Sequence, residues 1–322
     1  MHQCSFCNQT HITGIKKQPT PKDVICAVKT AVAHEDYGKM RLELAFFGGS
    51  FTALNRDYMI SLLKAAQPFI SKGVIKGIRI STRPDAIDRQ ILSILKTYGV
   101  SAIELGAQSM IDEVLKANRR GHTAQQVKDA STLIKQAGFE LGLQMMTGLY
   151  TDTAEGAKLT AQKIAECKPD TVRIYPTVIM SQTHLGELFQ RGDYQTFSLE
   201  KTVDLCSELL HFFEHRQIQV IRLGLHSTPE LEKERLSGPW HPALRELCES
   251  RNFRNSICNE LQKNHAVNKK CLLFINGKDR SKIVGHKKSN LEFFSSQGYN
   301  IQVIVDESIE KNSFKITFAD KE

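Results

Sequence analysis

Short apolar runs of strand length alternate with amphipathic helical stretches along the first two-thirds of the chain. Helical spacing of apolar residues covers 58–70, 88–98, 124–137, 153–167 and 199–215. The strand pattern occurs at 42–47, 77–84, 101–109, 139–149, 171–179 and 218–225. Strands that alternate with helices of about ten or more residues form crossover units with a parallel sheet. The pattern therefore predicts an α/β fold, a partial (β/α)6 barrel, in preference to a two-stage dinucleotide-binding fold.

The pattern changes after His226. A charged helix is expected over 228–235, a turn-rich break over 237–244 and a polar helix over 246–263. Strands at 271–277, 300–306 and 314–320 then flank a turn and helix over 282–299. We expect a barrel domain over 1–250 and a small C-terminal α/β module over 251–322.

Composition excludes several classes of protein. Of the 322 residues, 41% are hydrophobic and 24% are charged, enough apolar material for a packed core, so extended disorder and collagen-like structure are not expected. No apolar run approaches the ~18–20 residues that span a bilayer, and the first residues lack a signal-peptide pattern, so we expect a cytoplasmic protein without membrane contact. The net charge of +8 is compatible with nucleic-acid binding, although many basic enzymes bind only small molecules.

One pair among the eight cysteines has metal-ligand spacing. The other six are isolated, and we interpret them as reduced thiols. Cys4 and Cys7 form a CxxC pair, whose two sulfurs a tight turn can direct to one metal or cluster. Spacing alone leaves open an iron–sulfur cluster, zinc, a redox dithiol or no metal. Zinc would need two more close ligands, and a thioredoxin-type dithiol normally follows a strand in a different order of elements.

The surroundings of this pair resemble a known family. HQCSFCNQTHITG, followed by FFGGSFTAL, ISTRPDAI, IELGAQS, ANRRGHT, RIYPTVI and VIRLGLHST, is similar to the radical S-adenosylmethionine (SAM) superfamily. Within it the chain resembles the radical-SAM domain of the Elongator catalytic subunit and its short bacterial relatives, in order from residue 2 to about residue 245. The resemblance implies a 4Fe–4S cluster and SAM, a 5′-deoxyadenosyl radical, tRNA or another RNA as substrate, and a reductant protein of the flavodoxin or ferredoxin type.

The resemblance also identifies a missing ligand. The family signature is CxxxCxxC, and its three thiolates leave one iron open for SAM. Cys4 and Cys7 match the second and third ligands, whereas the first would fall immediately before Met1, together with part of the first barrel strand. We interpret the chain as shortened at its amino end, and its activity as in doubt, because two thiolates support a four-iron cluster poorly. His2 is a conceivable substitute ligand.

A glycine pair directly follows the strand at 42–47. Because Gly48 and Gly49 have no Cβ atoms, their backbone groups can approach a ligand closely, although a plain tight turn is the alternative. The resemblance assigns this turn to the amino group of SAM, with Ser50 in place of the usual acid. By the same resemblance Ser81, at the next strand end, reaches the SAM ribose or amino group; a capping turn before Pro84 is the alternative.

Polar residues also end the third and fourth strands. Glu104 needs a partner in its apolar surroundings, either the SAM ammonium or a neighbouring arginine. Gln108 and Arg120 match the spacing of two SAM contacts in relatives that resemble oxygen-independent coproporphyrinogen oxidase; the adjacent Arg119 is the alternative. Gln144 stands where those relatives often have an acid, and we expect it to contact the cofactor.

The later strands and the tail bear on the substrate. Tyr175, Arg222 and His226 lie near the expected substrate side, where His226 is either a proton carrier or a structural histidine. The tail segment IVGHKKSNLEFFSSQGYNIQVIV resembles a KH RNA-binding core, with Gly285 present but Lys288 in place of the second glycine of the GxxG loop. A small lid with a solvated basic face is the alternative.

Three functional hypotheses follow. The first is a radical SAM enzyme that acts on RNA, and the second is a non-catalytic RNA-binding protein on a degenerate barrel. The third is radical SAM chemistry on a small metabolite. The tail is too short for the acetyltransferase domain of the Elongator subunit, so acetyl-CoA use is not expected, and no residue is assigned to hydrogen abstraction.

Overall fold

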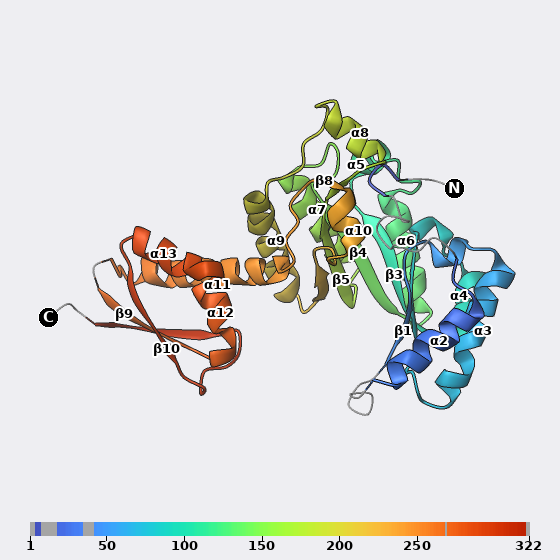
Figure 1. Cartoon of the computed structure of the whole chain (residues 1–322), viewed down its shortest axis with the longest axis horizontal. Coiled ribbons are helices and arrows are strands. Elements are labelled where there is room, and N and C mark those ends of the chain that lie inside the picture. Colours follow the sequence, from blue (N-terminus) through green and yellow to red (C-terminus); the bar gives the residue numbers. More distant parts are fainter. Residues whose placement is uncertain (1–3, 8–17, 35–41, 268, 320–322) are drawn as a thin grey trace. The chain divides into compact units, whose positions relative to one another are not determined.

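A curled sheet of six parallel strands forms the larger part of the molecule (Figure 1). The computed structural model describes residues 4–7, 18–34, 42–267 and 269–319. The strands lie side by side in chain order: β1 (Leu44–Phe46), β2 (Ile78–Thr82), β3 (Val100–Gln108), β4 (Glu140–Thr147), β5 (Thr171–Pro176) and β7 (Gln219–Leu223). Arg173 on β5 lies over the ring of Phe47, just after β1, with its guanidinium carbon 4.9 Å from the ring centroid. Because three strands separate β1 from β5, this contact requires strong curvature, and the predicted partial barrel is confirmed.

The connections between the strands are the predicted helices. They are α3 (Arg56–Ser71), α4 (Arg89–Thr97), α6 (Ala124–Gln136), α7 (Ala154–Glu166) and α9 (Leu199–Glu214). Each matches its predicted range to within two residues at each end. Side-chain oxygens that accept a backbone N–H mark the starts of four of them, namely Asn55, Asp88, Thr123 and Thr153.

Several short elements were not predicted. They are α2 (Pro21–Val32), α5 (Asp112–Ala117), α8 (His184–Gln190) and a small ladder of β6 (Ile179–Met180) with β8 (Arg235–Ser237). α5, α8 and the ladder are shorter than the windows in which periodicity is visible. α2 carried a usable signal, because Thr20 and Asp23 form a capping box with Pro21 at the first helical position.

The two faces of the sheet differ in chemistry. α4 and α6 contact β3 and α7 contacts β4, and the strands bury apolar side chains such as Ile103, Leu141 and Ile174 completely. Registered positions on parallel strands point to the same face. The other face, which we call the polar face, carries Glu104 opposite Gly142, and Gln144, Arg173 and Arg222 in one row across β4, β5 and β7. This face positions the candidate site.

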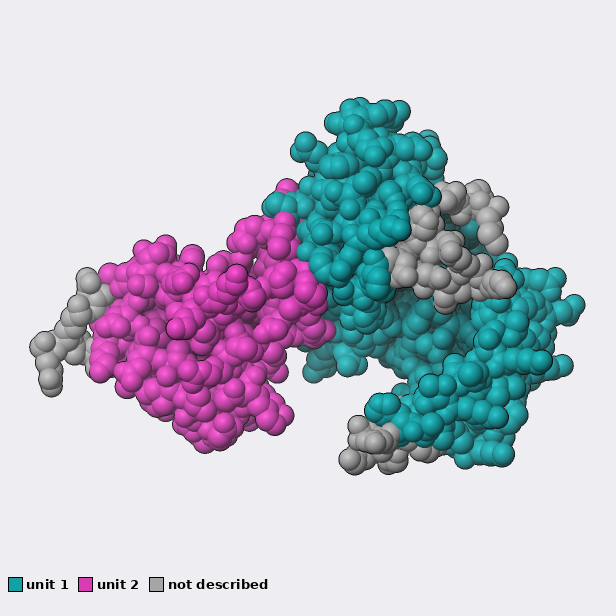
Figure 2. All heavy atoms as spheres, in the orientation of Figure 1, with its two compact units in different colours: residues 1–198, 213–240 teal, residues 199–212, 241–322 magenta. Residues whose placement is uncertain are grey.

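The chain divides into two compact units (Figure 2). Unit 1 comprises residues 1–198 and 213–240, and unit 2 comprises residues 199–212 and 241–322, so α9 contributes to both. Unit 2 has a three-stranded sheet with β9 (Lys270–Ile275) between parallel β10 (Asn300–Val305) and antiparallel β11 (Phe314–Ala319). Its helices are α11 (Leu244–Lys263), α12 (Arg280–Val284) and α13 (Ser289–Ser296). The predicted C-terminal α/β module is confirmed, whereas the boundary after residue 250, which falls within α11, stays a prediction.

The remaining elements within the described residues are short. They are α10 (Pro229–Glu234) and four 3-10 turns at Phe51–Ala53, Pro84–Ala86, Gly277–Asp279 and His286–Lys288. None of the helices in the described ranges is long and apolar enough to cross a membrane.

Candidate functional site

The turn that carries Cys4 and Cys7 is fastened to unit 1 through its backbone. The Cys7 N–H donates to the Cys4 carbonyl (3.2 Å), which closes the turn. Ser5, 1% exposed, donates its N–H to the Asn118 carbonyl (3.1 Å) and its hydroxyl to Asn118 Oδ1 (3.0 Å). The Leu185 N–H at the start of α8 donates to the Ser5 carbonyl (2.7 Å). The turn therefore has a fixed place at the carboxyl end of the sheet, beside α5 and α8 (Figure 1).

Asn118 and Phe6 complete this attachment. Asn118, fully buried, donates from Nδ2 to the carbonyls of Val114 (2.8 Å) and Tyr150 (2.9 Å). Phe6 packs against two apolar clusters, which consist of Ile179, Leu185, Leu188 and Tyr194 and of Val114, Met146 and Leu149. Sequence reasoning did not assign Asn118, although it lies inside the quoted ANRRGHT segment; the only available signal was its position two residues before Arg120.

Arg120 joins the cysteine turn to β3. Its NH1 donates to Cys4 Sγ (3.0 Å) and its NH2 to the Gly106 carbonyl (2.6 Å), while its buried Nε has no hydrogen-bond partner. A Cβ on Gly106 would lie 3.4 Å from Arg120 NH2 and 3.0 Å from Gln108 Nε2, so the glycine makes room for both side chains. Arg119 has a left-handed φ of 54° and places its NH2 3.0 Å from His184 Nε2. Arg120, not Arg119, is therefore the arginine beside the thiols.

The thiols supply a partial ligand set for a metal cluster. Burial raises the pKa of Cys7 to about 11, the neighbouring Cys4 adds to the rise, and Arg120 opposes it. Soft thiolates suit an iron–sulfur group or zinc. Among the described residues no cluster of three or more Cys, His, Asp or Glu side chains could hold a metal, and His2 lies outside them. The donor set thus fits two positions of a thiolate-bound cluster.

The glycine turn has the backbone that a ligand-contacting turn needs. Gly48 has a φ of 97°, a value that favours glycine, and both Gly48 and Gly49 are exposed. Ser50 precedes the 3-10 turn at 51–53, and its hydroxyl makes no capping hydrogen bond. Ser81, half-buried, is in register with Glu104, and its hydroxyl has no partner in the part of the chain that the structure describes.

Two amides meet at the carboxyl ends of β3 and β4. Gln144 Nε2 donates to Gln108 Oε1 over 3.3 Å. Gln108 is 5% exposed and has a left-handed φ of 64° where the register between the two strands shifts. A non-glycine residue in this conformation costs free energy and is characteristic of functional sites. The structure thus brings Gln108, Gln144 and Arg120 together around Gly106.

Glu104 lies in an ion-pair network. Its two oxygens accept from Arg173 Nε (2.6 Å) and NH2 (2.9 Å), and Arg79 NH1 lies 3.6 Å away. Arg79 also pairs with Glu43 and Glu140, each at 2.8 Å. The bidentate pair compensates the charge of this buried carboxylate and uses two of its roughly four lone-pair positions. Glu104 thus has a neighbouring arginine as a partner, and its predicted contact with SAM stays a prediction.

A buried histidine that the sequence analysis did not single out lies next to Arg120. His122 is 5% exposed, and its Nε2 lies 3.1 Å from the Ala107 carbonyl. Burial, with the positive charge of Arg120, lowers the pKa of His122 to about 4. The imidazole is therefore neutral, Nε2–H donates to the carbonyl, and the buried Nδ1 keeps a lone pair without a partner.

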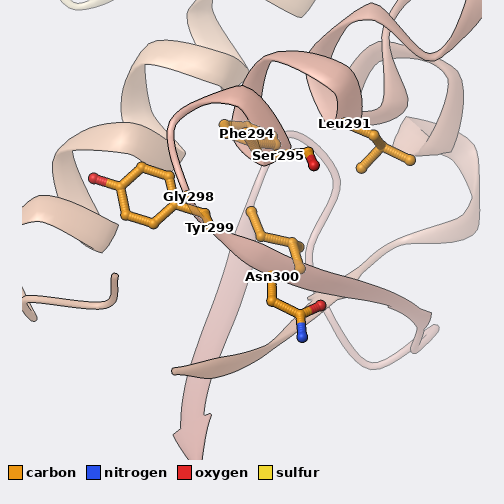
Figure 3. A pocket seen from close by; sticks show the side chains of 7 residues that line it. Leu291, Phe294, Ser295, Gly298, Tyr299 and Asn300 are labelled. Carbon is orange, nitrogen blue, oxygen red and sulfur yellow. The ribbon is translucent and has the colours of Figure 1, made fainter. Parts of the chain in front are cut away.

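A surface cavity of about 360 Å³ lies in unit 2, between α13 and β10 (Figure 3). Its lining residues are Leu291, Phe294, Ser295, Gly298, Tyr299, Asn300 and Ile301. This lining contains no carboxylate, imidazole, thiol or cationic side chain, so the cavity offers no ligand set for a metal, and the Tyr299 phenol is its one titratable side chain.

Two family models match the chain up to residue 253. The model of the Radical SAM superfamily matches residues 1–164, and that of the Radical_SAM C-terminal domain matches residues 169–253. Elongator complex protein 3 of Homo sapiens is 31% identical over 192 residues, which cover 53% of this chain and 35% of that protein. A tRNA uridine(34) acetyltransferase of Methanocaldococcus jannaschii is 28% identical over 187 residues, with 52% and 35% coverage.

A solved structure has the same fold. It is the archaeal Methanocaldococcus infernus Elp3 with an N-terminal deletion, and it superimposes with a TM-score of 0.59 at 21% identity, over 76% of this chain and 59% of that one. The chain spans about a third of the length of these curated relatives.

Proposed function

Because the chain belongs to the radical SAM superfamily, we propose that it is a radical SAM enzyme that modifies RNA, with tRNA as the substrate class. When bound, a reduced 4Fe–4S cluster and SAM supply a 5′-deoxyadenosyl radical, which removes a hydrogen atom from the substrate. One observation carries the proposal: the anchored turn of Cys4 and Cys7 lies against Arg120 at the carboxyl end of the sheet, where Gln108 and Gln144 also meet. In parallel α/β barrels this end is the ligand-binding end.

Different residues around the cysteine turn would bind the cluster and SAM. Cys4 and Cys7 would each bind one iron, and Arg120 would offset the charge of the Cys4 thiolate. The buried and unpartnered Arg120 Nε fits the carboxylate of SAM, since a guanidinium binds carboxylates with several parallel donors. We assign the backbone of Gly48 and Gly49 to the SAM amino group.

Four polar side chains are assigned around these groups. Ser50 and Ser81 offer hydroxyls without hydrogen-bond partners among the described residues, and we assign them to the amino group and the ribose. Gln108 and Gln144 would contact the remaining polar edge of SAM. Glu104 pairs with Arg173 and connects two strands of the polar face, and its predicted contact with the SAM ammonium stays a prediction.

Two observations support RNA as the substrate. A related protein is named a tRNA uridine(34) acetyltransferase, and the chain carries a net charge of +8, which favours a polyanionic partner. A flavodoxin- or ferredoxin-type protein is the electron donor we propose.

Anaerobic reconstitution tests the enzyme. The full chain, and the same chain with one cysteine inserted directly before Met1, are loaded with iron and sulfide, reduced, and incubated with SAM. The insertion creates CxxxCxxC spacing, so we expect about four irons and four sulfides per chain and formation of 5′-deoxyadenosine. Cys4→Ala and Cys7→Ala should lose the cluster, whereas Cys26→Ala, at an exposed position of α2, should retain it. Absence of a cluster from both parent chains would refute the proposal.

A second candidate is a non-catalytic RNA-binding protein. The observation that favours it is that the described residues supply only two thiolates and no further ligand to the site. Salt-sensitive binding of tRNA by chains that take up no cluster would support this second function. SAM cleavage without tRNA binding would instead indicate chemistry on a small metabolite.

A further inference from the structure

Arg222 occupies an unusual position on the polar face. It lies in register with Arg173 on the neighbouring parallel strand, so two guanidinium groups share one row of the sheet. Arg173 is neutralised by its bidentate pair with Glu104. Arg222 donates from Nε to the Gly224 carbonyl (2.8 Å), and in the described ranges it forms no ion pair with a carboxylate. It is the cation of this row whose charge is left without a counterion.

The surroundings of Arg222 disfavour its charge. Burial lowers the pKa of the Arg222 guanidinium; the neighbouring Tyr175 opposes this effect, and the positive charge of Arg173 adds to it. His226, exposed after β7, also lies close enough to Arg222 and Arg173 for their charges to lower its pKa further, beyond the effect of burial. Like charges in neighbouring positions of a sheet are destabilising. An anion bound at Arg222 would remove this repulsion and supply the missing partner.

An exposed aromatic ring lies on the same concave face. Phe47 is 51% exposed, although its ring packs against the Arg173 guanidinium at 4.9 Å. Arg173 thus connects the row that holds Arg222 with the ring of Phe47. Aromatic rings beside cationic groups are the surfaces on which single-stranded nucleic acids stack their bases while their phosphates are neutralised.

We propose that Arg222 binds a phosphate group of the substrate nucleotide, and that Phe47 presents its open ring surface to a base. The inference rests on the proposed function for its substrate class, RNA, but assigns the recognition to particular residues. A guanidinium offers parallel donors that match two phosphate oxygens. The other anion available to Arg222 is the SAM carboxylate, and the experiment separates the two.

The first measurement is binding of a fluorescently labelled anticodon stem-loop to the full-length chain, by anisotropy at several salt concentrations. Arg222→Gln should weaken binding about tenfold at low salt and lower the slope of log K against log salt by about one, the value for one lost phosphate contact. Arg222→Lys keeps the charge, so its affinity for the stem-loop should lie between those of the parent chain and Arg222→Gln. Arg89→Gln, an exposed position at the start of α4, removes the same charge from a helix and should leave both quantities unchanged.

The second measurement compares uridine 5′-monophosphate with uridine by ligand-observed nuclear magnetic resonance, and SAM by equilibrium dialysis. The parent chain should favour the monophosphate, Arg222→Gln should lose this preference, and SAM binding should not change. Binding of the monophosphate through Arg222 without binding of the stem-loop would support this site and refute RNA as the substrate.

Three outcomes overturn the inference. The first is that Arg222→Gln binds the stem-loop and the monophosphate as the parent chain does. The second is that the parent chain does not prefer the monophosphate to uridine. The third is that Arg222→Gln loses SAM binding but keeps the preference for the monophosphate. If Arg222→Gln does not fold, which thermal unfolding would show, the same comparisons are made with Arg222→Lys, whose weaker, single-point contact should still reduce the preference.

Discussion

Two buried polar atoms near Cys4, Arg120 Nε and His122 Nδ1, have no hydrogen-bond partner. Buried polar groups are nearly always satisfied, so such atoms require an explanation. Both belong to one short segment, and both lie at the carboxyl end of β3, where Gly106 accepts from Arg120 and Ala107 faces His122. Their shared location is consistent with a polar ligand at this end of the sheet, as the proposed function requires.

His122 should make the protein less stable in acid. Its pKa is about 4 in the folded chain and near 6.5 when unfolded, so between these values the unfolded chain binds the extra proton. The neutral His122 makes its whole contribution to the free energy of unfolding above pH 6.5, and this contribution is lost as the pH falls through 4. In His122→Gln the loss of stability between pH 7 and 4.5 should shrink by about 2 kcal/mol, measured by urea denaturation at both pH values.

The matched control is Gln90→Ala, which changes a side chain without a titratable group at an exposed position of α4. It should keep the pH dependence of the parent chain. If His122→Gln has the same pH dependence as the parent chain, the imidazole is not held neutral by burial.

Gly106→Ala should displace Arg120. The added Cβ would lie 3.4 Å from Arg120 NH2 and 3.0 Å from Gln108 Nε2, and overpacking of this kind costs about 1–3 kcal/mol. We expect a lower melting temperature and at least a tenfold loss of SAM affinity. A double-mutant cycle checks the cause: if the glycine acts through Arg120, Gly106→Ala should add little to the loss of SAM affinity caused by Arg120→Ala alone. Additive losses would contradict this mechanism.

At the scale of elements, the short helices α5 and α8 matter most for the site. α5 ends just before Asn118, and the Leu185 N–H of α8 holds the cysteine turn. Neither helix was predicted, because six or seven residues are too few for a periodic signal. The long elements that build the sheet were predicted, and the short ones that position the thiols were not.

The attachment of the cysteine turn depends on Asn118. Asn118→Ala removes the side-chain bonds to Ser5, Val114 and Tyr150, and should lower the free energy of unfolding by about 2–3 kcal/mol. The amide of Ser5 should then exchange its hydrogen faster, which hydrogen-exchange mass spectrometry measures. Asn264→Ala, which removes two bonds to Glu260 at the end of α11, should lower stability without changing exchange at Ser5. Unchanged exchange in both variants would show that the turn is held by other contacts.

The sequence predicted the sheet better than it predicted the contacts on it. Apolar runs bounded by helices identified all six strands, because burial of a parallel sheet imposes a strong pattern. The spacing from Gln108 favoured Arg120, but the sequence left Arg119 open, since its conformation includes a left-handed φ and its side chain lies beside His184. The partner of Glu104 stayed open for a similar reason: Arg173 is distant in sequence and meets Glu104 only through the register of β3, β4 and β5.

At the scale of the whole molecule, the two units are not continuous in sequence. Residues 199–212 of α9 belong to unit 2, although they interrupt the residues of unit 1. Arg251 on α11, 8% exposed, pairs with Glu200 at 2.5 Å and with Asp204, both on α9. A pattern read along the chain favours a single boundary point, and it could not show that α9 is shared.

Arg251→Ala should therefore destabilise unit 2. It removes both ion pairs to α9 and the packing of a mostly buried side chain, and we expect a loss of about 1–3 kcal/mol in the free energy of unfolding, measured by thermal or urea denaturation. Arg191→Ala breaks an exposed pair with Asp193 and should cost less than about 0.5 kcal/mol. Equal losses of stability for the two substitutions would mean that the ion pairs of Arg251 do not stabilise the packing of α9 against α11.

The attachment of the cysteine turn has a consequence for the order of events during synthesis. Residues 4–7 are translated before their anchors, because Asn118 and Leu185 lie more than a hundred residues further along the chain. Until Leu185 has been translated, the segment that carries the two thiols lacks one of the hydrogen bonds that anchor it to unit 1. If the proposed cluster binds this turn, stable loading of iron would follow translation of most of unit 1, and stalled chains that end before α8 should carry no metal.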